Sequence, residues 1–188
     1  MPEEDKIFLD IIQRNAKRID NLIGELLDSY RPYEKVFKVT NLRSILEDTL
    51  QLAYDRIHLK GIKISASYPS DPCIIQADEE KLKIAFLNIV VNATEAIANG
   101  SGEVVIVLSE KPEHYIVEIS DNGSGIPPEI LAKLFEPYFT SKRNGMGLGL
   151  ASTLNIVQSH GGTIDVESEV NNGSKFIVSV PKIKEQQD

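Results

Sequence analysis

The sequence predicts an α/β protein in which one long amphipathic helix precedes a domain of mixed helices and strands. Two patterns support this class. Apolar residues recur every three or four positions in several segments, as on one face of a helix, and alternate with polar residues in others, as on a half-buried strand. Turn-rich loops join two pairs of those strands as antiparallel hairpins. The length of 188 residues accommodates one ordinary domain and an accessory element, because domains commonly run to about 100–150 residues.

The first predicted element is a long amphipathic helix over Asp5–Tyr30. Its apolar residues recur at helical spacing, and Arg31 followed by Pro32 ends the segment. Because this apolar stripe has nothing within its own segment to pack on, it needs a partner helix or a domain face. We therefore treat residues 1–33 and residues 34–188 as separate parts of the chain.

Asn41 is predicted to cap a second helix that runs to Gly61, after a short extended piece at residues 36–39. Residues 62–68 then alternate apolar and polar side chains, which predicts a strand with one buried face. That face would carry Ile62, Ile64, Ala66 and Tyr68.

A short strand at residues 73–76 precedes the third predicted helix, Glu79–Ala98, for which Asp78 supplies the N-cap. Two hairpins and two further helices complete the domain. The hairpin strands are Val104–Ser109 with Tyr115–Ser120 and Thr163–Ser168 with Lys175–Val180; the helices are a short one at residues 128–134 and one ending near His160.

Charge and composition exclude several functions. The net charge of −8 and the pI near 5.0 disfavour nonspecific attraction to nucleic acid or anionic lipid. No stretch approaches the roughly 20 apolar residues that a spanning helix needs, so we expect no membrane contact within this segment. The one cysteine, Cys73, excludes an internal disulfide and a Cys-x-x-Cys metal site, and we expect a buried thiol.

The third predicted helix is apolar almost all round and carries a single polar line. That line consists of Asn88, Asn92, Glu95 and Asn99. At about 100° per residue these positions lie within roughly 60° of one another. Such a line either faces solvent or borders a cavity. Amide oxygens are neutral, hard ligands that can join phosphate oxygens and waters around Mg²⁺, which makes a magnesium–phosphate site the functional alternative.

Two glycine-rich loops offer further candidate chemistry. Asp121 ends a strand and is followed by Gly123 and Gly125. The two glycines permit a ligand to approach the backbone closely, and the carboxylate can accept a hydrogen bond from an amino group of that ligand. An ordinary Asp-Asn-Gly turn is the alternative. Residues 145–151 place glycines before a helix, where bare N–H groups together with Lys142 can bind phosphate; the alternative is a surface loop.

Taken in order, these motifs resemble the N, G1, F and G2 boxes of the histidine-kinase ATP-binding domain, within the gyrase, chaperone, kinase and mismatch-repair ATPase superfamily. The boxes correspond to Asn88 with Asn92, residues 121–125, residues 135–139 and residues 145–149. The resemblance extends from about Val36 to Pro181. It implies a two-layer α/β sandwich of the Bergerat type, with three main helices on one face of a mostly antiparallel mixed sheet and the nucleotide between the helices and a lid.

For the base of ATP, the resemblance implies that Asp121 hydrogen-bonds the adenine amino group, while Gly123 and Gly125 shape the adenine wall. Ser174 matches a position where many members have Thr, whose hydroxyl assists adenine binding through water. The whole implied cofactor-binding set is Asn88, Asn92, Asp121, Gly123, Gly125, Ile126, Phe135, Thr140, Ser141, Lys142, Gly145, Met146, Gly147, Leu148, Gly149, Leu150 and Ser174.

For the phosphates, the resemblance implies that Asn92 and Asn88 meet Mg²⁺ and that Lys142 is the nearest cation to the terminal phosphates. Gyrase and the chaperone ATPases place a glutamate base at the position of Asn88; asparagine cannot take a proton, so fast hydrolysis is disfavoured. Glu95 lies on the same line and could orient a group or act as a base; solvation or pairing at the helix end is the alternative, and both stay open. The implied catalytic set is Asn88, Glu95 and Lys142.

The implied function is binding of Mg-ATP and transfer of its γ-phosphate to a histidine of a two-component sensor kinase. Residues 22–32 resemble the second helix of the dimerisation and phosphoacceptor hairpin, but His58, His114 and His160 lack the acidic residue that follows an acceptor histidine. We therefore expect no autophosphorylation by this chain alone and an acceptor helix upstream in a parent chain or on another chain.

The further partners that the resemblance implies are a response regulator and, through residues 5–30, a second copy of the intact protein. The expected location is the cytoplasm, including the cytoplasmic part of a membrane-bound sensor. Two alternatives are a protein serine kinase of the anti-sigma type and a nucleotide-sensing module that transfers no phosphate.

Overall fold

The computed structural model describes residues 37–98, 102–140 and 146–183, all within the compact unit Val36–Asp188. The helix predicted over Asp5–Tyr30, and with it the proposed dimerisation segment, lies outside the described residues.

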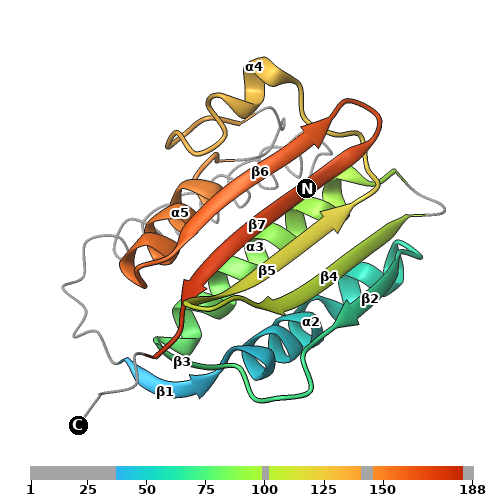
Figure 1. The fold of residues 1–188 in the computed structure, drawn as a ribbon. Helices are drawn as coiled ribbons and strands as arrows, with labels where there is room; N and C mark the ends of the chain where they lie inside the picture. Colours follow the sequence, from blue (N-terminus) through green and yellow to red (C-terminus); the bar gives the residue numbers. More distant parts are fainter. Residues whose placement is uncertain (1–36, 99–101, 141–145, 184–188) are drawn as a thin grey trace, which may run out of the picture. The chain divides into compact units, whose positions relative to one another are not determined.

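The described residues form two layers, a sheet and a set of helices on one of its faces (Figure 1). The strands are β1 (Lys38–Asn41), β2 (Lys63–Ser67), β3 (Ile74–Ala77), β4 (Glu103–Glu110), β5 (His114–Asp121), β6 (Thr163–Glu169) and β7 (Gly173–Pro181). The helices are α2 (Leu42–Leu59), α3 (Glu79–Ala96), α4 (Pro128–Leu131) and α5 (Gly149–Ser159). The predicted class is confirmed, and so is the order of the predicted elements within the described residues.

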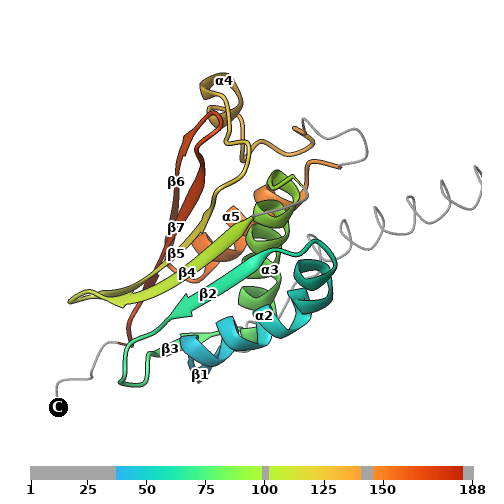
Figure 2. The same cartoon turned by 90° about the vertical axis from the view of Figure 1, so that its right-hand side faces the viewer.

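The main sheet has the strand order β2-β4-β5-β7-β6, in which β2 runs parallel to β4 and the other neighbours are antiparallel. Figure 2 shows α2, α3 and α5 on the same side of this sheet. Strands β1 and β3 form a separate antiparallel pair. Both predicted hairpins are present, β4 with β5 and β6 with β7.

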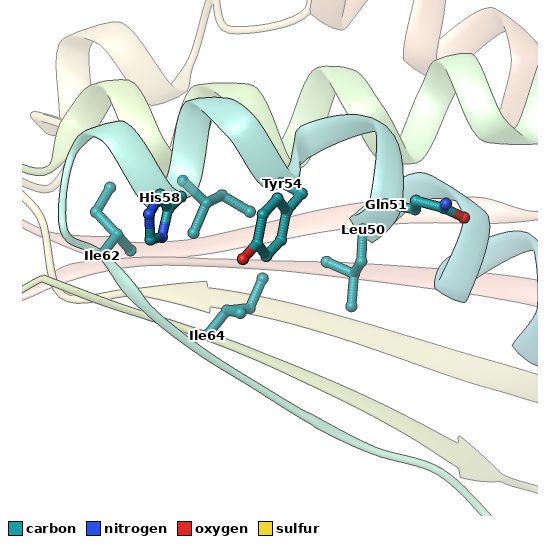
Figure 3. Close-up of a pocket in the computed structure, with 7 residues that line it drawn as sticks. Leu50, Gln51, Tyr54, His58, Ile62 and Ile64 are labelled. Carbon is teal, nitrogen blue, oxygen red and sulfur yellow. The ribbon is translucent and has the colours of Figure 1, made fainter.

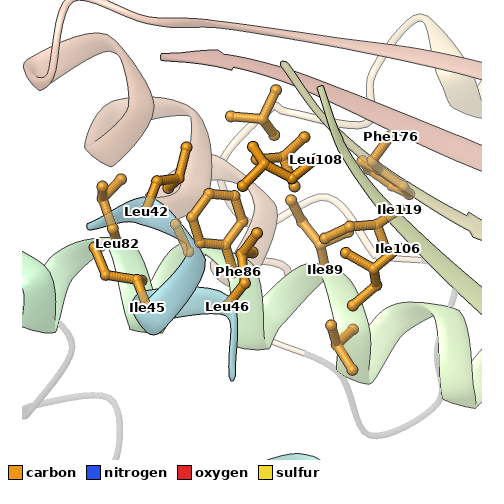
Figure 4. Packing of buried hydrophobic residues seen from close by; sticks show 14 of the residues in the cluster. Leu42, Ile45, Leu46, Leu82, Phe86, Ile89, Ile106, Leu108, Ile119 and Phe176 are labelled. Carbon is orange, nitrogen blue, oxygen red and sulfur yellow. The ribbon is translucent and has the colours of Figure 1, made fainter. Parts of the chain in front are cut away.

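The hydrophobic core lies between the sheet and the helices (Figure 4). Phe86 and Ile89 of α3 are fully buried and pack in one cluster with Ile119 of β5 and Phe176 of β7. Alternate residues of β5 and β7 point into this core, since every second position of each strand is buried. This alternation decides which side chains reach the helix side at the ends of the strands.

The predicted caps are confirmed. The Asn41 carboxamide oxygen accepts the Arg43 N–H at 3.1 Å and the Cys73 N–H at 3.2 Å, so one side chain starts α2 and holds the strand-like segment before β3. The Asp78 carboxylate accepts the Lys81 N–H at 3.2 Å and caps α3. Cys73 is buried as expected, and this burial raises the pKa of its thiol.

His160 is buried and has a structural role. Its Nδ1–H donates to the Ile156 carbonyl oxygen at 2.8 Å, which leaves Nε2 to accept the Asp78 N–H at 3.1 Å. The ring also stacks on Phe37, with centroids 4.7 Å apart. With both nitrogens engaged inside the fold, His160 does not present itself as a phosphoacceptor.

One predicted burial is wrong. Ile62 is buried and Ile64 half-buried, but Ala66, assigned to the same inward face, is exposed. The sheet order accords with the difference, because β2 is the edge strand and has a neighbouring strand on one side only. Among the helices that the structure describes, none has both the length and the apolar character of a membrane span.

Candidate functional site

Three polar side chains lie in one row across the main sheet. Asp121 at the end of β5 pairs in register with Ser174 of β7, and Ser174 pairs with Ser168 of β6. Residues directly opposite each other on antiparallel strands project from the same face, which here is the core face. The next row inward is apolar and consists of Ile119, Phe176 and Val166. A polar row thus ends an otherwise apolar face.

Asp121 is the buried acid of this row, with only 8% of its surface exposed. The Gly123 N–H donates to its Oδ1 at 2.8 Å, and the Ser174 backbone N–H also bonds the carboxylate. Burial raises the pKa of Asp121, and these two hydrogen bonds oppose the rise without cancelling it. The carboxylate is therefore held in place and poorly hydrated, as a hydrogen-bond acceptor for a ligand needs to be.

Ser168 belongs to the site although the sequence motifs did not identify it. Its Oγ accepts the Ile126 N–H at 2.8 Å and donates to the Gly173 carbonyl oxygen at 2.8 Å. It also lies 3.0 Å from the Ser174 Oγ. The sequence pattern that could have identified Ser168 is its spacing of four residues from Ile164, since alternate residues of a strand share a face and the Ser168 hydroxyl therefore lies on the inward face.

The loop after Asp121 rests on the last turn of α3. The Ser124 N–H donates to the Ala96 carbonyl oxygen at 3.0 Å, and a Cβ added at Gly123 would meet that same carbonyl group at 2.7 Å. Glycine at position 123 is therefore required by the closeness of the helix. Figure 1 shows that the end of β5, the β6–β7 turn and α4 all lie at one end of the sheet.

Farther back along α3, Asn88 contacts the start of α5. Its Nδ2–H donates to the Gly149 carbonyl oxygen at 3.1 Å and lies 3.4 Å from the Thr153 Oγ1. Asn88 and Ala96 are about 12 Å apart along the helix axis, at 1.5 Å per residue. One helix thus joins the Asp121 loop to the glycine-rich segment over a length that an extended nucleoside triphosphate can bridge.

Thr153 supports the contact between α3 and the start of α5, and the sequence motifs did not identify it. It is fully buried, and its hydroxyl donates to the Gly149 carbonyl oxygen at 2.9 Å, within the first turn of α5.

The Oδ1 of Asn88 is the atom of that side chain that can meet a cation, because the Asn88 amide hydrogens are used in hydrogen bonds to α5. Neutral oxygen donors from Asn88 and Asn92 fit Mg²⁺ bound together with phosphate.

The start of α5 offers further groups for phosphate. Leu148 is the N-cap, and its side chain caps none of the first N–H groups of the helix, which are the groups that bind anions at a helix N-terminus. The Tyr138 N–H donates to the Gly147 carbonyl oxygen at 3.0 Å and joins the chain before and after residues 141–145. A Cβ at Gly147, where φ is +70°, would lie 2.5 Å from the Phe139 carbonyl oxygen.

The remaining predicted residues fall into three groups. Phe135 and Leu150 pack against the core cluster, and Ile126 contributes the N–H that Ser168 accepts. Thr140 and Met146 flank the undescribed stretch. Ser141, Lys142 and Gly145 lie outside the described residues, so their predicted roles stay predictions.

Glu95 lies on the exposed side of α3, and its carboxylate is 3.4 Å from the Arg56 guanidinium of α2. Both side chains are substantially exposed, so this ion pair contributes little to stability. The contact accords with the pairing alternative for Glu95, while its role as a base stays a prediction.

A separate cavity of about 380 Å³ lies between α2 and the edge strand β2 (Figure 3). Tyr54 and His58 stack there with ring centroids 5.6 Å apart, beside Leu50 and Ile64. The lining holds no carboxylate, lysine or arginine, and none of the predicted site residues belongs to it. This cavity therefore lacks the chemistry for a triphosphate, unlike the row that ends at Asp121.

Comparison with known proteins places this geometry in a family. Residues 77–184 match the family described as histidine kinase-, DNA gyrase B-, and HSP90-like ATPase. Sporulation kinase A of Bacillus subtilis is 35% identical over 181 residues, covering 96% of this chain and 30% of the relative. The sensor histidine kinase ZraS of Klebsiella oxytoca is 34% identical over 179 residues, covering 95% of this chain and 38% of the relative. The chain thus spans roughly a third of the length of these relatives.

Among solved structures, the nucleotide-free catalytic domain of the histidine kinase ThkA superposes with a TM-score of 0.71 and 31% identity. The match covers 78% of this chain and 95% of that domain. ThkA in complex with the response regulator TrrA matches with a TM-score of 0.78 and 26% identity over 100% of this chain and 54% of that one. The chain therefore belongs to the histidine kinase-, gyrase- and HSP90-like ATPase family and carries the ATP-binding catalytic domain of a histidine kinase.

Proposed function

We propose that the chain binds Mg-ATP along α3 and presents the γ-phosphate to a histidine of a two-component kinase. The observation that carries this proposal is the row formed by the buried Asp121 and Ser174 and the half-buried Ser168, set at the end of an apolar face. A fixed, poorly hydrated carboxylate beside an apolar wall is suited to a flat heterocycle that bears an amino group. Family membership independently supports ATP as the nucleotide.

The phosphates would lie toward Asn88, Asn92 and the start of α5. Mg²⁺ would be held by the amide oxygens of the two asparagines together with phosphate oxygens, and would supply neutralisation of phosphate charge. Asn88 is fixed by its bond to Gly149, so this oxygen ligand is oriented before nucleotide arrives. The N–H groups at the start of α5, which the Leu148 side chain does not cap, add fixed positive dipoles on the same side.

Phosphoryl transfer asks the protein mainly for positioning and charge neutralisation. Asn88 cannot accept a proton from water, so nothing at this position activates hydrolysis. We propose that Lys142 adds a charge at the terminal phosphates and that Glu95 orients the incoming group. Catalysis then depends on an acceptor histidine that another helix brings to the γ-phosphate.

We propose that this acceptor helix belongs to a parent chain or to another chain, and that a response regulator takes the phosphate onward. The solved complex of ThkA with its response regulator supports that partner class. Pairing of two intact copies through residues 5–30 and a cytoplasmic location complete the proposal.

Replacing Asn92 with alanine is expected to weaken ATP binding about tenfold in the presence of Mg²⁺ and to change metal-free binding much less. The reason is that an amide oxygen ligand is lost only when the cation is bound; a tenfold change in affinity corresponds to about 1.4 kcal/mol. Calorimetric titration with and without Mg²⁺ measures both effects. Asn155→Ala, at an exposed position on α5, is the matched control. Equal losses in both conditions would contradict the magnesium role.

The function itself is tested by incubating the chain with ATP labelled on the γ-phosphate, alone and with a separate hairpin that carries an acceptor histidine. We expect acid-labile label on the hairpin only when both chains are present. Acid-stable label on a serine would instead indicate a serine kinase of the anti-sigma type. Tight binding of ATP without any label would indicate a nucleotide-sensing module.

A further inference from the structure

The hydroxyl of Ser168 has every hydrogen-bonding position filled inside the fold. A serine hydroxyl carries one proton and two lone pairs. The proton goes to the Gly173 carbonyl oxygen at 2.8 Å, since a carbonyl can only accept. One lone pair accepts the Ile126 N–H at 2.8 Å. The contact with the Ser174 Oγ at 3.0 Å uses the other lone pair.

This arrangement determines which way the Ser174 hydroxyl points. Because Ser168 has no second proton, Ser174 is the donor in their contact. The Ser174 Oγ can then offer only lone pairs in any other direction. Its neighbour in the row, the ionised Asp121 carboxylate, also only accepts. Two adjacent buried side chains therefore present acceptors and no proton to whatever binds there.

We propose that Ser168 is a positioning residue that fixes Ser174 as an acceptor, so that the site selects purines with a 6-amino group over those with a 6-oxo group. The inference rests on the proposed nucleotide site and adds the origin of its base selectivity. A 6-amino group supplies two N–H donors to the acceptors of Asp121 and Ser174. A 6-oxo group turns its own lone pairs toward them, and unpaired buried acceptors are costly.

The probe pair is ATP and inosine triphosphate, whose bases differ only at positions 1 and 6. For the unaltered chain we expect ATP to bind on the order of 100-fold more tightly than inosine triphosphate. The 6-oxo group donates no hydrogen bond to Asp121 or Ser174, and its own lone pairs face the lone pairs of these two acceptors. In Ser168→Ala the Ser174 proton is released and can rotate toward a 6-oxo group. The ratio of the two dissociation constants is then expected to fall about tenfold, while Ser168→Thr, which keeps the hydroxyl, retains the ratio.

A merely structural role for Ser168 gives a different result. Both nucleotides would weaken together in Ser168→Ala, and an unchanged ratio would overturn the proposal. Ser174→Ala provides a second test that leaves the bonds from Ser168 to Ile126 and Gly173 in place. Ser174→Ala removes the Ser174 acceptor and should also lower the ratio of the two dissociation constants. An unchanged ratio in this variant would likewise overturn the proposal. Failure of the unaltered chain to bind ATP would contradict the proposed function instead.

Discussion

Replacing Asp121 with asparagine is expected to raise the dissociation constant for ATP about 10- to 100-fold, because a hydrogen bond to a charged acceptor is worth about 1.5–3 kcal/mol. Asparagine keeps the size of the side chain and an oxygen for the Gly123 N–H. It introduces an NH₂ group where the adenine amino group needs an acceptor. Calorimetric titration measures the change, and Asp165→Asn, an exposed acid on β6, is the control that removes the same charge.

The same variant is expected to be at least as stable as the unaltered chain at neutral pH. Burial raises the pKa of Asp121 above its value in the unfolded chain, so the folded state favours the protonated acid. The protonated acid therefore stabilises the folded state fully at pH values below the pKa that Asp121 has in the unfolded chain. This stabilisation is lost as the pH rises through the pKa that Asp121 has in the folded chain. At neutral pH the ionised carboxylate therefore lowers the free energy of unfolding, and asparagine removes that penalty.

Thermal unfolding at several pH values checks this expectation. The stability advantage of Asp121→Asn should be present at neutral pH and shrink on acidification through the raised pKa. A variant that bound ATP poorly and was also much less stable at neutral pH would indicate that Asp121 has a structural role. A stable variant with weak binding would show that the burial of this charge serves the ligand.

Replacing Gly125 with alanine is expected to lower the free energy of unfolding by about 2–4 kcal/mol and to weaken ATP binding more than tenfold. Gly125 has φ of +68°, and a Cβ there would lie 2.0 Å from the Glu169 carbonyl oxygen. The clash is with backbone, so the loop that follows Asp121 and the β6–β7 turn must move apart. The Asn171 N–H, which donates to the Ser124 carbonyl oxygen at 2.7 Å, would lose its alignment.

Gly61→Ala separates the two causes of this loss. Gly61 has φ of +64°, but a Cβ there meets nothing within 4 Å. Its substitution should cost only the left-handed strain of about 1–2 kcal/mol and leave ATP binding unchanged. Chemical denaturation and calorimetric titration of both variants give the comparison. Equal losses of stability in the two variants would contradict the predicted clash at Gly125.

Local sequence was sufficient to predict those parts of the fold that local chemistry determines. The caps at Asn41 and Asp78, the helical stripes and the two hairpins all depend on residues close together in the chain. The parallel pairing of β2 with β4 and the separate β1–β3 pair depend on distant segments, and spacing alone does not determine them.

The same distinction applies to the site. Asp121, Asn88 and the glycines are identifiable because their chemistry is unusual where they occur. Ser168 becomes part of the site only through the register of β6 on β7, and of β7 on β5, which places it two strands from Asp121. Thr153 likewise matters because α5 packs beside α3. A period-two or helical pattern identifies the face on which such residues lie but not their neighbours.

The most direct test of this account is a structure of the chain with Mg²⁺ and a nonhydrolysable ATP analogue. We expect the 6-amino nitrogen about 2.7–3.2 Å from the Asp121 carboxylate, with the triphosphate toward Asn88 and the start of α5. A base that makes no contact with Asp121, or a nucleotide bound in the cavity between α2 and β2, would contradict the account.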